Sequence, residues 1–284
     1  MTNGPEDPRR RALRHGVVLA GLIVTAYVYL VLRDPSWSRI GTDSLAYWAA
    51  DPANLYVGAT VGGDVAYLYS PAFAQAFAVF RLLPPFAFVV AWAALVIVVA
   101  VRLARPWPAA LLALSLPVSQ EILMGNIHIL LAAAMVAGFR YPATWSFVLL
   151  TKVTPGIGLL WFAVRREWRM LAVAVGATAA IVGMSVLISP EDWAAWLHLL
   201  LRDGGQESSR LLVRLALAAA LIAWGALTDR RWVVPAAGLL ALPVVWMDSF
   251  SMLLGCVALA AWQRPARVNP SERGQPNAEQ VSGG

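Results

Sequence analysis

One lysine stands out among the residues of this chain that could do chemistry. Lys152 lies within the apolar stretch TWSFVLLTKVTPGIGLLWFAV, residues 144–164, and it is the only lysine in the sequence. An ionisable side chain inside an apolar segment costs free energy unless it meets a partner or a water-filled cavity, so such a residue suggests a functional site. We therefore expect Lys152 to bind an anion. The competing interpretation is a lysine that snorkels to the surface or lies in a loop.

Two further polar features lie outside or between apolar runs. Asp43 begins the short helical pattern DSLAYWAA, and the block GNIH, residues 125–128, separates two apolar segments. A helix cap is the competing interpretation of Asp43, because a carboxylate is favoured at a helix N-terminus. A carboxylate that takes a proton from a hydroxyl group, together with a deeper cation that stabilises a departing phosphate, suits group transfer from a lipid phosphate.

Signatures of other chemistries are missing from the sequence. It contains no GxSxG, HExxH or Walker-type motif and no GxGxxG in a strand context. Its histidines, His15, His128 and His198, lie far apart, so we expect no histidine metal site and no cofactor. The single cysteine, Cys256, lies in an apolar segment and is interpreted as core packing.

The composition indicates a membrane protein. Of 284 residues, 60% are hydrophobic and 13% are charged, with a mean hydropathy of +0.65. The net charge of +6 would suit a nucleic-acid partner, but the arginines cluster at the ends of apolar runs instead. We therefore expect membrane lipids, and no nucleic acid, as surroundings.

The apolar runs predict an all-α, polytopic transmembrane protein with about eight to nine spans. One membrane domain should cover residues 16–263, between a basic cytoplasmic tail at 1–15 and a disordered cytoplasmic tail at 264–284. The candidate spans are 16–32, 86–103, 107–123, 127–139, 168–188, 211–227, 232–247 and 249–263.

Arginine-rich loops orient the chain, because such loops stay in the cytoplasm. With both termini inside, Arg140 and Arg165 share the cytoplasmic side only if the segment 143–164 enters and leaves on one face. We therefore predict a broken or re-entrant segment there, since proline and glycine follow Lys152. A rival count makes this segment one full span.

Three polar or short segments should lie on the outer face of a bacterial-type plasma membrane. They are the outer loop 33–70, an apolar helix after Tyr69 that lies in the outer leaflet, and an amphipathic segment at 189–210 with tryptophans and leucines at helical spacing. This places Asp43 outside.

The order of these motifs resembles glycosyltransferase family 87. The similarity extends over about residues 16–262 and is carried by DSLAY (43–47), YLYSP (67–71), GNIH (125–128), KVTP (152–155) and RREWR (165–169), with weaker echoes in QESS (206–209) and PVVWMDSF (243–250). This family comprises membrane mannosyltransferases of the GT-C type that take mannose from polyprenyl-phosphate mannose.

The resemblance implies a role for each motif. Asp43 corresponds to the essential outer-loop aspartate, the general base that activates a lipid or glycan acceptor. The phosphate and lipid of the donor would be bound by Lys152, His128, Asn126 and Arg39. The sugar or acceptor would be bound by Tyr47, Tyr67, Tyr69 and Asp248. A lipid-phosphate leaving group can be stabilised by cationic side chains, so we expect a metal-free mechanism; a cation held by Asp43, Asp51 and Asp64 is the alternative.

Two other classes of function stay open at this point. A transporter or flippase of a polyprenyl-linked substrate would also place Lys152 at a broken helix near the membrane midplane, although it should show internal repeats, and we find none that is convincing. A catalytically inactive partner subunit is the third class, suggested by the short chain.

Overall fold

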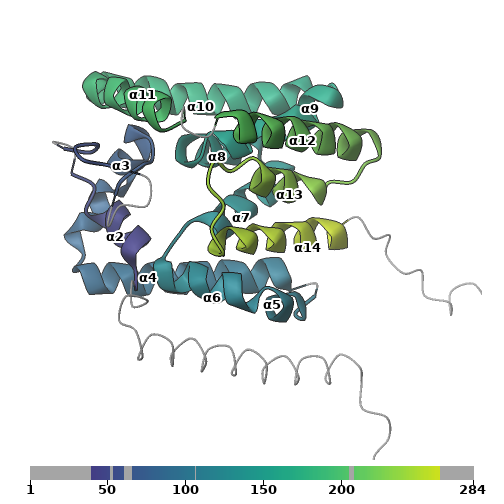
Figure 1. Ribbon diagram of the computed structural model, residues 1–284, viewed down its shortest axis with the longest axis horizontal. Helices are drawn as coiled ribbons and strands as arrows, with labels where there is room; N and C mark the ends of the chain where they lie inside the picture. Colours follow the sequence, from purple (N-terminus) through teal and green to yellow (C-terminus); the bar gives the residue numbers. More distant parts are fainter. Residues whose placement is uncertain (1–39, 52–53, 61–65, 106, 205–207, 263–284) are drawn as a thin grey trace, which may run out of the picture.

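The structure, a computed structural model, describes residues 40–51, 54–60, 66–105, 107–204 and 208–262. Within these ranges all regular secondary structure is helical, as predicted, and Figure 1 shows the helices stacked in layers. The predicted span 16–32, both tails and part of the outer loop lie outside the described residues.

Three helices are long and apolar enough to cross a membrane. They are α4 (Pro85–Ala104), α10 (Trp168–Ile188) and the part Arg210–Leu227 of α12 (Ser208–Leu227), which coincide with the predicted spans 86–103, 168–188 and 211–227. Figure 1 shows α10 and α12 along one edge of the molecule and α4 along the opposite edge. These helices lie on the outside of the bundle, where apolar side chains such as Leu187 and Leu217 are exposed.

The other predicted spans form shorter helices. The first group is α5 (Ala110–Ala113), α6 (Ser115–Met124) and α7 (His128–Gly138); the second is α13 (Val233–Leu240), η5 (Asp248–Met252) and α14 (Leu253–Trp262). The helices α6 and α7 meet at 107°, and counting them as one bent span gives at most four spans in the described chain. The predicted count of eight to nine is therefore not confirmed, because helices of eight to eleven residues are too short for a full crossing.

The segment around Lys152 forms a hairpin of short helices. It consists of η3 (Pro142–Thr144), α8 (Trp145–Thr151), η4 (Thr154–Leu159) and α9 (Leu160–Val164). The rings of Trp161 and Phe162 lie 5.5 and 5.8 Å from that of Phe139, which precedes the hairpin, so both of its ends lie at the same end of the bundle. Lys152 lies at its tip. Its re-entry into a membrane stays a prediction.

Arginine side chains gather at the end of the bundle where this hairpin begins and ends. Arg165 binds Asp229 at 3.1 Å between Nη1 and Oδ1 and also donates to the carbonyl of Ala226. Arg231 lies over the ring of Phe139. These contacts bring the loops after α7, α9 and α12 to one face, as the arginine-based topology requires.

Short helices cover the opposite end. They are α2 (Thr42–Trp48), α3 (Pro71–Phe77), η2 (Ala78–Leu82) and α11 (Pro190–Gly204). Residues 190–204 of the segment predicted to be amphipathic, 189–210, form α11, with Trp193 and Trp196 buried against α3 and the hairpin residue Leu150. Trp196 also donates to the carbonyl of Leu68, so α11 is bound to the segment that leads into α3.

An aromatic cluster fixes α2 in the fold. The buried ring of Tyr47 meets the rings of Tyr69, Phe73, Phe77 and Trp92 edge-on, at centroid distances of 5.1 to 6.1 Å. Edge-to-face pairs of this kind add to the free energy gained by burial. The helix that carries Asp43 is therefore held firmly against α3 and α4.

Candidate active site

The site is built at the corner between α6 and α7. Gly125 ends α6 with a φ of +74°, a conformation that glycine adopts without strain, and its carbonyl accepts a hydrogen bond from Trp92 Nε1 at 2.7 Å. Asn126 Oδ1 then accepts the backbone N–H of Ile127 at 2.8 Å. The predicted polar block GNIH is thus a tight corner held by hydrogen bonds.

The same corner receives α2. The backbone N–H of Gly41, just before α2, donates to the carbonyl of Leu123 at 2.6 Å. A Cβ atom placed on Gly125 would lie 2.5 Å from Ser44 Oγ, so α2 and the corner touch where only a hydrogen atom fits. This contact places Asp43 beside the side chains that leave α6 and α7.

Glu121 and His128 form a fully buried pair across this corner. Glu121 Oε2 lies 3.0 Å from His128 Nδ1, and Glu121 Oε1 accepts the backbone N–H of Ile129 at 3.0 Å. The carboxylate therefore satisfies a free donor at the start of α7 and orients the imidazole ring. Glu121 was not predicted from its sequence context, although it is a lone acid inside the apolar run 107–123.

Lys152 reaches the other side of the same ring. Its Nζ lies 2.8 Å from His128 Nε2, and Ser249 Oγ lies 3.3 Å from that nitrogen. An ammonium group can only donate, so Nε2 accepts and the ring proton is on Nδ1, facing Glu121. Lys152 itself is half-buried, and its ammonium group keeps further N–H donors for a ligand.

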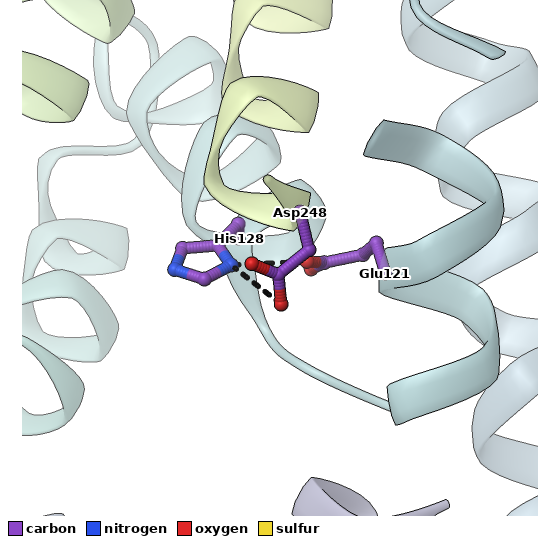
Figure 2. A group of neighbouring side chains, drawn as sticks. All are labelled: Glu121, His128 and Asp248. Atoms are coloured by element: carbon purple, nitrogen blue, oxygen red, sulfur yellow. Dashed lines mark hydrogen bonds and ion pairs between the residues drawn. The ribbon is translucent and has the colours of Figure 1, made fainter. Parts of the chain in front are cut away.

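Asp248 approaches from η5. Its Oδ2 accepts a hydrogen bond from Asn126 Nδ2 at 3.0 Å and lies 3.9 Å from His128 Nδ1. Figure 2 shows the carboxylates of Asp248 and Glu121 both pointing at this ring nitrogen. Asp248 is only 4% exposed, yet its Oδ1 has no hydrogen-bond partner among the described residues.

Asp43 completes the cluster from the first turn of α2. Burial raises the pKa of its carboxyl from 3.8 to about 6; the charge of Asp248 adds to this, that of Lys152 opposes it, and that of Glu121 raises it further. A carboxyl group with a pKa near 6 is ionised at neutral pH and still takes up a proton readily. The structure thus brings together five of the residues predicted for the site: Asp43, Asn126, His128, Lys152 and Asp248.

The predicted sugar-binding tyrosines form a buried layer next to this cluster. The hydroxyl groups of Tyr47 and Tyr69 are 3.1 Å apart, and the hydroxyl of Tyr67 donates to the carbonyl of Ser70. Their rings are at most 9% exposed, so they shape the wall behind Asp43 and α3. Contact with a sugar stays a prediction for all three.

Other predicted residues are not part of the described site. Arg39 and Asp64 lie outside the described residues, and Asp51 is exposed at the end of the segment after α2. The alternative cation site of Asp43, Asp51 and Asp64 therefore cannot be assembled from the described side chains.

A hollow of about 990 Å³ lies elsewhere, between residues 54–57, α3 and α11, and is lined among others by Gln75, His198 and Arg202. None of the residues gathered around His128 lines it. The geometry of the ionisable cluster, rather than cavity size, identifies the candidate active site.

One group in the described part of the chain is able to hold a metal ion. Single ligand atoms of Glu121, His128 and Asp248 all lie within 4.8 Å of one another, and all three side chains are buried. This set differs from the one that the sequence suggested as an alternative.

Comparison with known proteins identifies the family of this chain. The family model for glycosyltransferase family 87 matches residues 67–274, which include Glu121, Asn126, His128, Lys152 and Asp248 but not Asp43. Neither a curated protein nor a solved structure matches the chain significantly. The match covers well over half of the sequence, and the chain is therefore a member of glycosyltransferase family 87.

Proposed function

We propose that this protein transfers a hexose, with mannose as the expected sugar, from a polyprenyl-phosphate donor to a glycolipid or glycan acceptor on the outer face of the membrane. Membership of the family supports a glycosyltransferase. The arrangement of Lys152 and Asp43 around one polar corner supports the donor and the mechanism.

The observation that carries the proposal is the bond between Lys152 Nζ and His128 Nε2 at 2.8 Å. It fixes the only lysine of the chain at the tip of a hairpin between apolar helices, where its remaining N–H groups can meet an anion. A lipid-linked phosphate is the anion that approaches such a position from the membrane.

The reaction is a direct displacement at the anomeric carbon. The acceptor oxygen forms a bond to that carbon while the bond from carbon to the phosphate oxygen breaks, and the acceptor proton passes to the carboxylate of Asp43. The electron pair of the broken bond stays on the polyprenyl phosphate, whose growing charge Lys152 stabilises. A base with a pKa of about 6 suits this proton transfer at neutral pH.

Glu121 and His128 act as positioning residues in this scheme. The buried carboxylate holds the imidazole through Nδ1, and the imidazole holds the lysine through Nε2. A chain of bonds of this kind reduces the reorganisation needed when charge develops on the leaving group.

The orientation follows the positive-inside rule. The arginine-rich end of the bundle would face the cytoplasm, and the end with α2, α3 and α11 would face outside. The three long helices α4, α10 and α12 would be spans, and the hairpin of α8 and α9 would re-enter from the cytoplasmic side.

The test is transfer of radiolabelled mannose from polyprenyl-phosphate mannose by purified protein in detergent with a panel of glycolipid acceptors. We expect transfer by the wild type and a loss of at least about 100-fold in Asp43→Asn, the range typical of a general base. Asp51→Asn, an exposed acid in the loop after the same helix, is the matched control and should be unaffected.

Detergent solution also separates the alternatives, because it contains no compartments to transport between. Undiminished transfer by Asp43→Asn would remove the base assignment. Binding of the donor without transfer to any acceptor would favour a flippase or an inactive partner subunit instead.

A further inference from the structure

We propose that Glu121, His128 and Asp248 bind one divalent transition-metal ion, Mn²⁺ or Zn²⁺, next to Lys152. The site rests on the geometry of these three side chains and is independent of the reaction. Its role in stabilising the leaving phosphate rests on the proposed function.

The ligand atoms lie close to the spacing that a shared ion requires. A metal ion about 2.1 Å from each ligand requires neighbouring ligand atoms roughly 3.0 to 3.4 Å apart at angles near 90° to 110°. His128 Nδ1 lies 3.0 Å from Glu121 Oε2 and 3.9 Å from Asp248 Oδ2, and all three atoms fall within 4.8 Å of one another. Small side-chain shifts would complete the site.

An unpartnered oxygen points to a missing ligand. Asp248 is 4% exposed, and its Oδ1 has no hydrogen-bond partner among the described residues, although buried carboxylate oxygens are normally bonded. Its other oxygen, Oδ2, accepts the hydrogen bond of Asn126 and lies 3.9 Å from His128 Nδ1, so the carboxylate offers the ion one bonded and one unbonded oxygen.

The number of acidic side chains in this cluster also favours a bound cation. In the described part of the chain, the carboxyl groups of Asp43, Glu121 and Asp248 lie near one ammonium group, that of Lys152. Buried charges are stable only when they are paired or coordinate a metal. A cation would balance the excess of carboxyl groups over ammonium groups in this cluster.

The hydrogen bonds of Glu121 and His128 also support binding of an ion. Glu121 Oε1 is held by the N–H of Ile129, which leaves Oε2 for the ion. When Nδ1 of His128 binds the ion, the ring proton moves to Nε2, where Ser249 Oγ at 3.3 Å can accept it. In the ion-bound state Lys152, which can only donate, exchanges its bond to Nε2 for one to the phosphate, so its bond to His128 belongs to the ion-free protein.

This ligand set explains why the sequence predicted no metal. That expectation rested on three widely separated histidines, whereas the site uses one histidine and two carboxylates from α6 and η5. One nitrogen and two oxygens suit Mn²⁺ or Zn²⁺, and the ligands left open would be filled by water or by a phosphate oxygen, as in catalytic metal sites. The ion would act as a Lewis acid on the phosphate, beside the lysine.

Metal binding is measured directly on the purified full-length protein after treatment with EDTA. Mn²⁺ is added while the electron paramagnetic resonance signal of free Mn²⁺ is recorded, and Zn²⁺ is then added as a competitor. We expect one Mn²⁺ bound per chain and its displacement by Zn²⁺. A wild-type protein that binds no ion would overturn the proposal without any variant.

Matched variants locate the ion. Glu121→Gln keeps the shape of the side chain and should weaken Mn²⁺ binding by at least about tenfold. Even the loss of a residue that only supports a metal ligand weakens binding by about this factor, and Glu121 would be a ligand itself. Glu191→Gln, an exposed acid on α11, should bind as the wild type does. Asp248→Asn serves as a second variant in case Glu121→Gln elutes as an aggregate. Equal binding by the wild type, Glu121→Gln and Asp248→Asn would show surface adsorption only and overturn the site.

The two proposals fail in different ways. Mannose transfer by ion-free protein that binds no Mn²⁺ or Zn²⁺ would overturn the metal site and leave the proposed function intact. One bound ion without transfer from any polyprenyl-phosphate donor would support the site and overturn the function.

Discussion

Lys152 Nζ donates to His128 Nε2 across 2.8 Å, and this bond joins the tip of one helical hairpin to the first residue of α7. The contact orders a lysine side chain that would otherwise lose rotamer entropy when it binds a ligand. It also explains why a histidine is needed at the end of the GNIH block: only an unprotonated ring nitrogen accepts from the lysine while Nδ1 faces Glu121.

Replacement of Lys152 should slow mannose transfer more than it lowers the unfolding temperature. We expect Lys152→Met to lower kcat for mannose transfer by about 100- to 1,000-fold, the loss seen when one preorganised charge-stabilising donor is removed. The methionine keeps the apolar stem, so the unfolding temperature should change little. Rates and thermal unfolding are measured on the same preparations.

Arg169→Met is the control for loss of a positive charge, because Arg169 is exposed on α10. It should transfer mannose at the wild-type rate. A Lys152→Met protein with unchanged kcat would show that Lys152 is structural.

The rate should depend on pH through Asp43. Its carboxyl must be ionised to accept a proton, so with a pKa raised to about 6 the rate should rise as pH increases through that value and level off above pH 7. Below pH 5 the group is protonated and the rate should fall about tenfold per pH unit. A profile of kcat/KM from pH 4.5 to 8 measures this midpoint.

Neighbouring charges should shift the same midpoint in a known direction. Burial is the largest cause of the raised pKa, the negative charge of Asp248 adds to it, and Lys152 and Glu121 act in opposite directions. Asp248→Asn removes the second cause and should therefore move the midpoint to lower pH, whatever it does to the maximal rate. A midpoint that stays in place would mean that another group titrates.

The sequence predicted the helical class and the long helices, because hydropathy and length suffice for α4, α10 and the part Arg210–Leu227 of α12. It also predicted the break at Lys152, since proline and glycine residues cannot continue a regular helix there. The full spans predicted at the short helices are not confirmed, because a hydropathy pattern records burial but not whether lipid or protein surrounds a helix.

The site was predicted only in part for a related reason. Asp43, Asn126, His128 and Lys152 carried motif signals, but Glu121 lies in an apolar run, and its importance appears only when the 107° bend brings it to His128. Its pairing with His128 and the approach of Asp248 from η5 are tertiary contacts, and no local propensity encodes them.

The backbone conformation at position 125 and the close contact with α2 both require a glycine there. Its φ of +74° is strained for alanine, and an added Cβ would lie 2.5 Å from Ser44 Oγ. Gly125→Ala should therefore destabilise the protein by about 1 to 3 kcal/mol and displace Asp43, so that the unfolding temperature and the transfer rate fall together.

Gly176→Ala is the matched control for this change. Gly176 lies inside α10, and a Cβ there meets nothing within 4 Å, so alanine should be neutral or stabilise the helix by up to about 1 kcal/mol. Equal unfolding temperatures for both variants would mean that the corner tolerates a side chain and that α2 is not fixed by this contact.

The two ends of the bundle should be accessible from opposite sides of the membrane. Arg165 and Asp229 lie at the arginine-rich end, whereas Asp51 lies at the end with α2, and both aspartates are exposed. In a Cys256→Ser background, we expect Asp51→Cys to react with a membrane-impermeant maleimide on intact cells. Asp229→Cys should react only after the cells are opened, since arginine-rich loops stay in the cytoplasm. The reverse pattern would place the site on the cytoplasmic face. That orientation would overturn transfer to an outer acceptor, yet leave the chemistry of Asp43 and Lys152 unchanged, because their contacts do not depend on which side the donor's sugar faces.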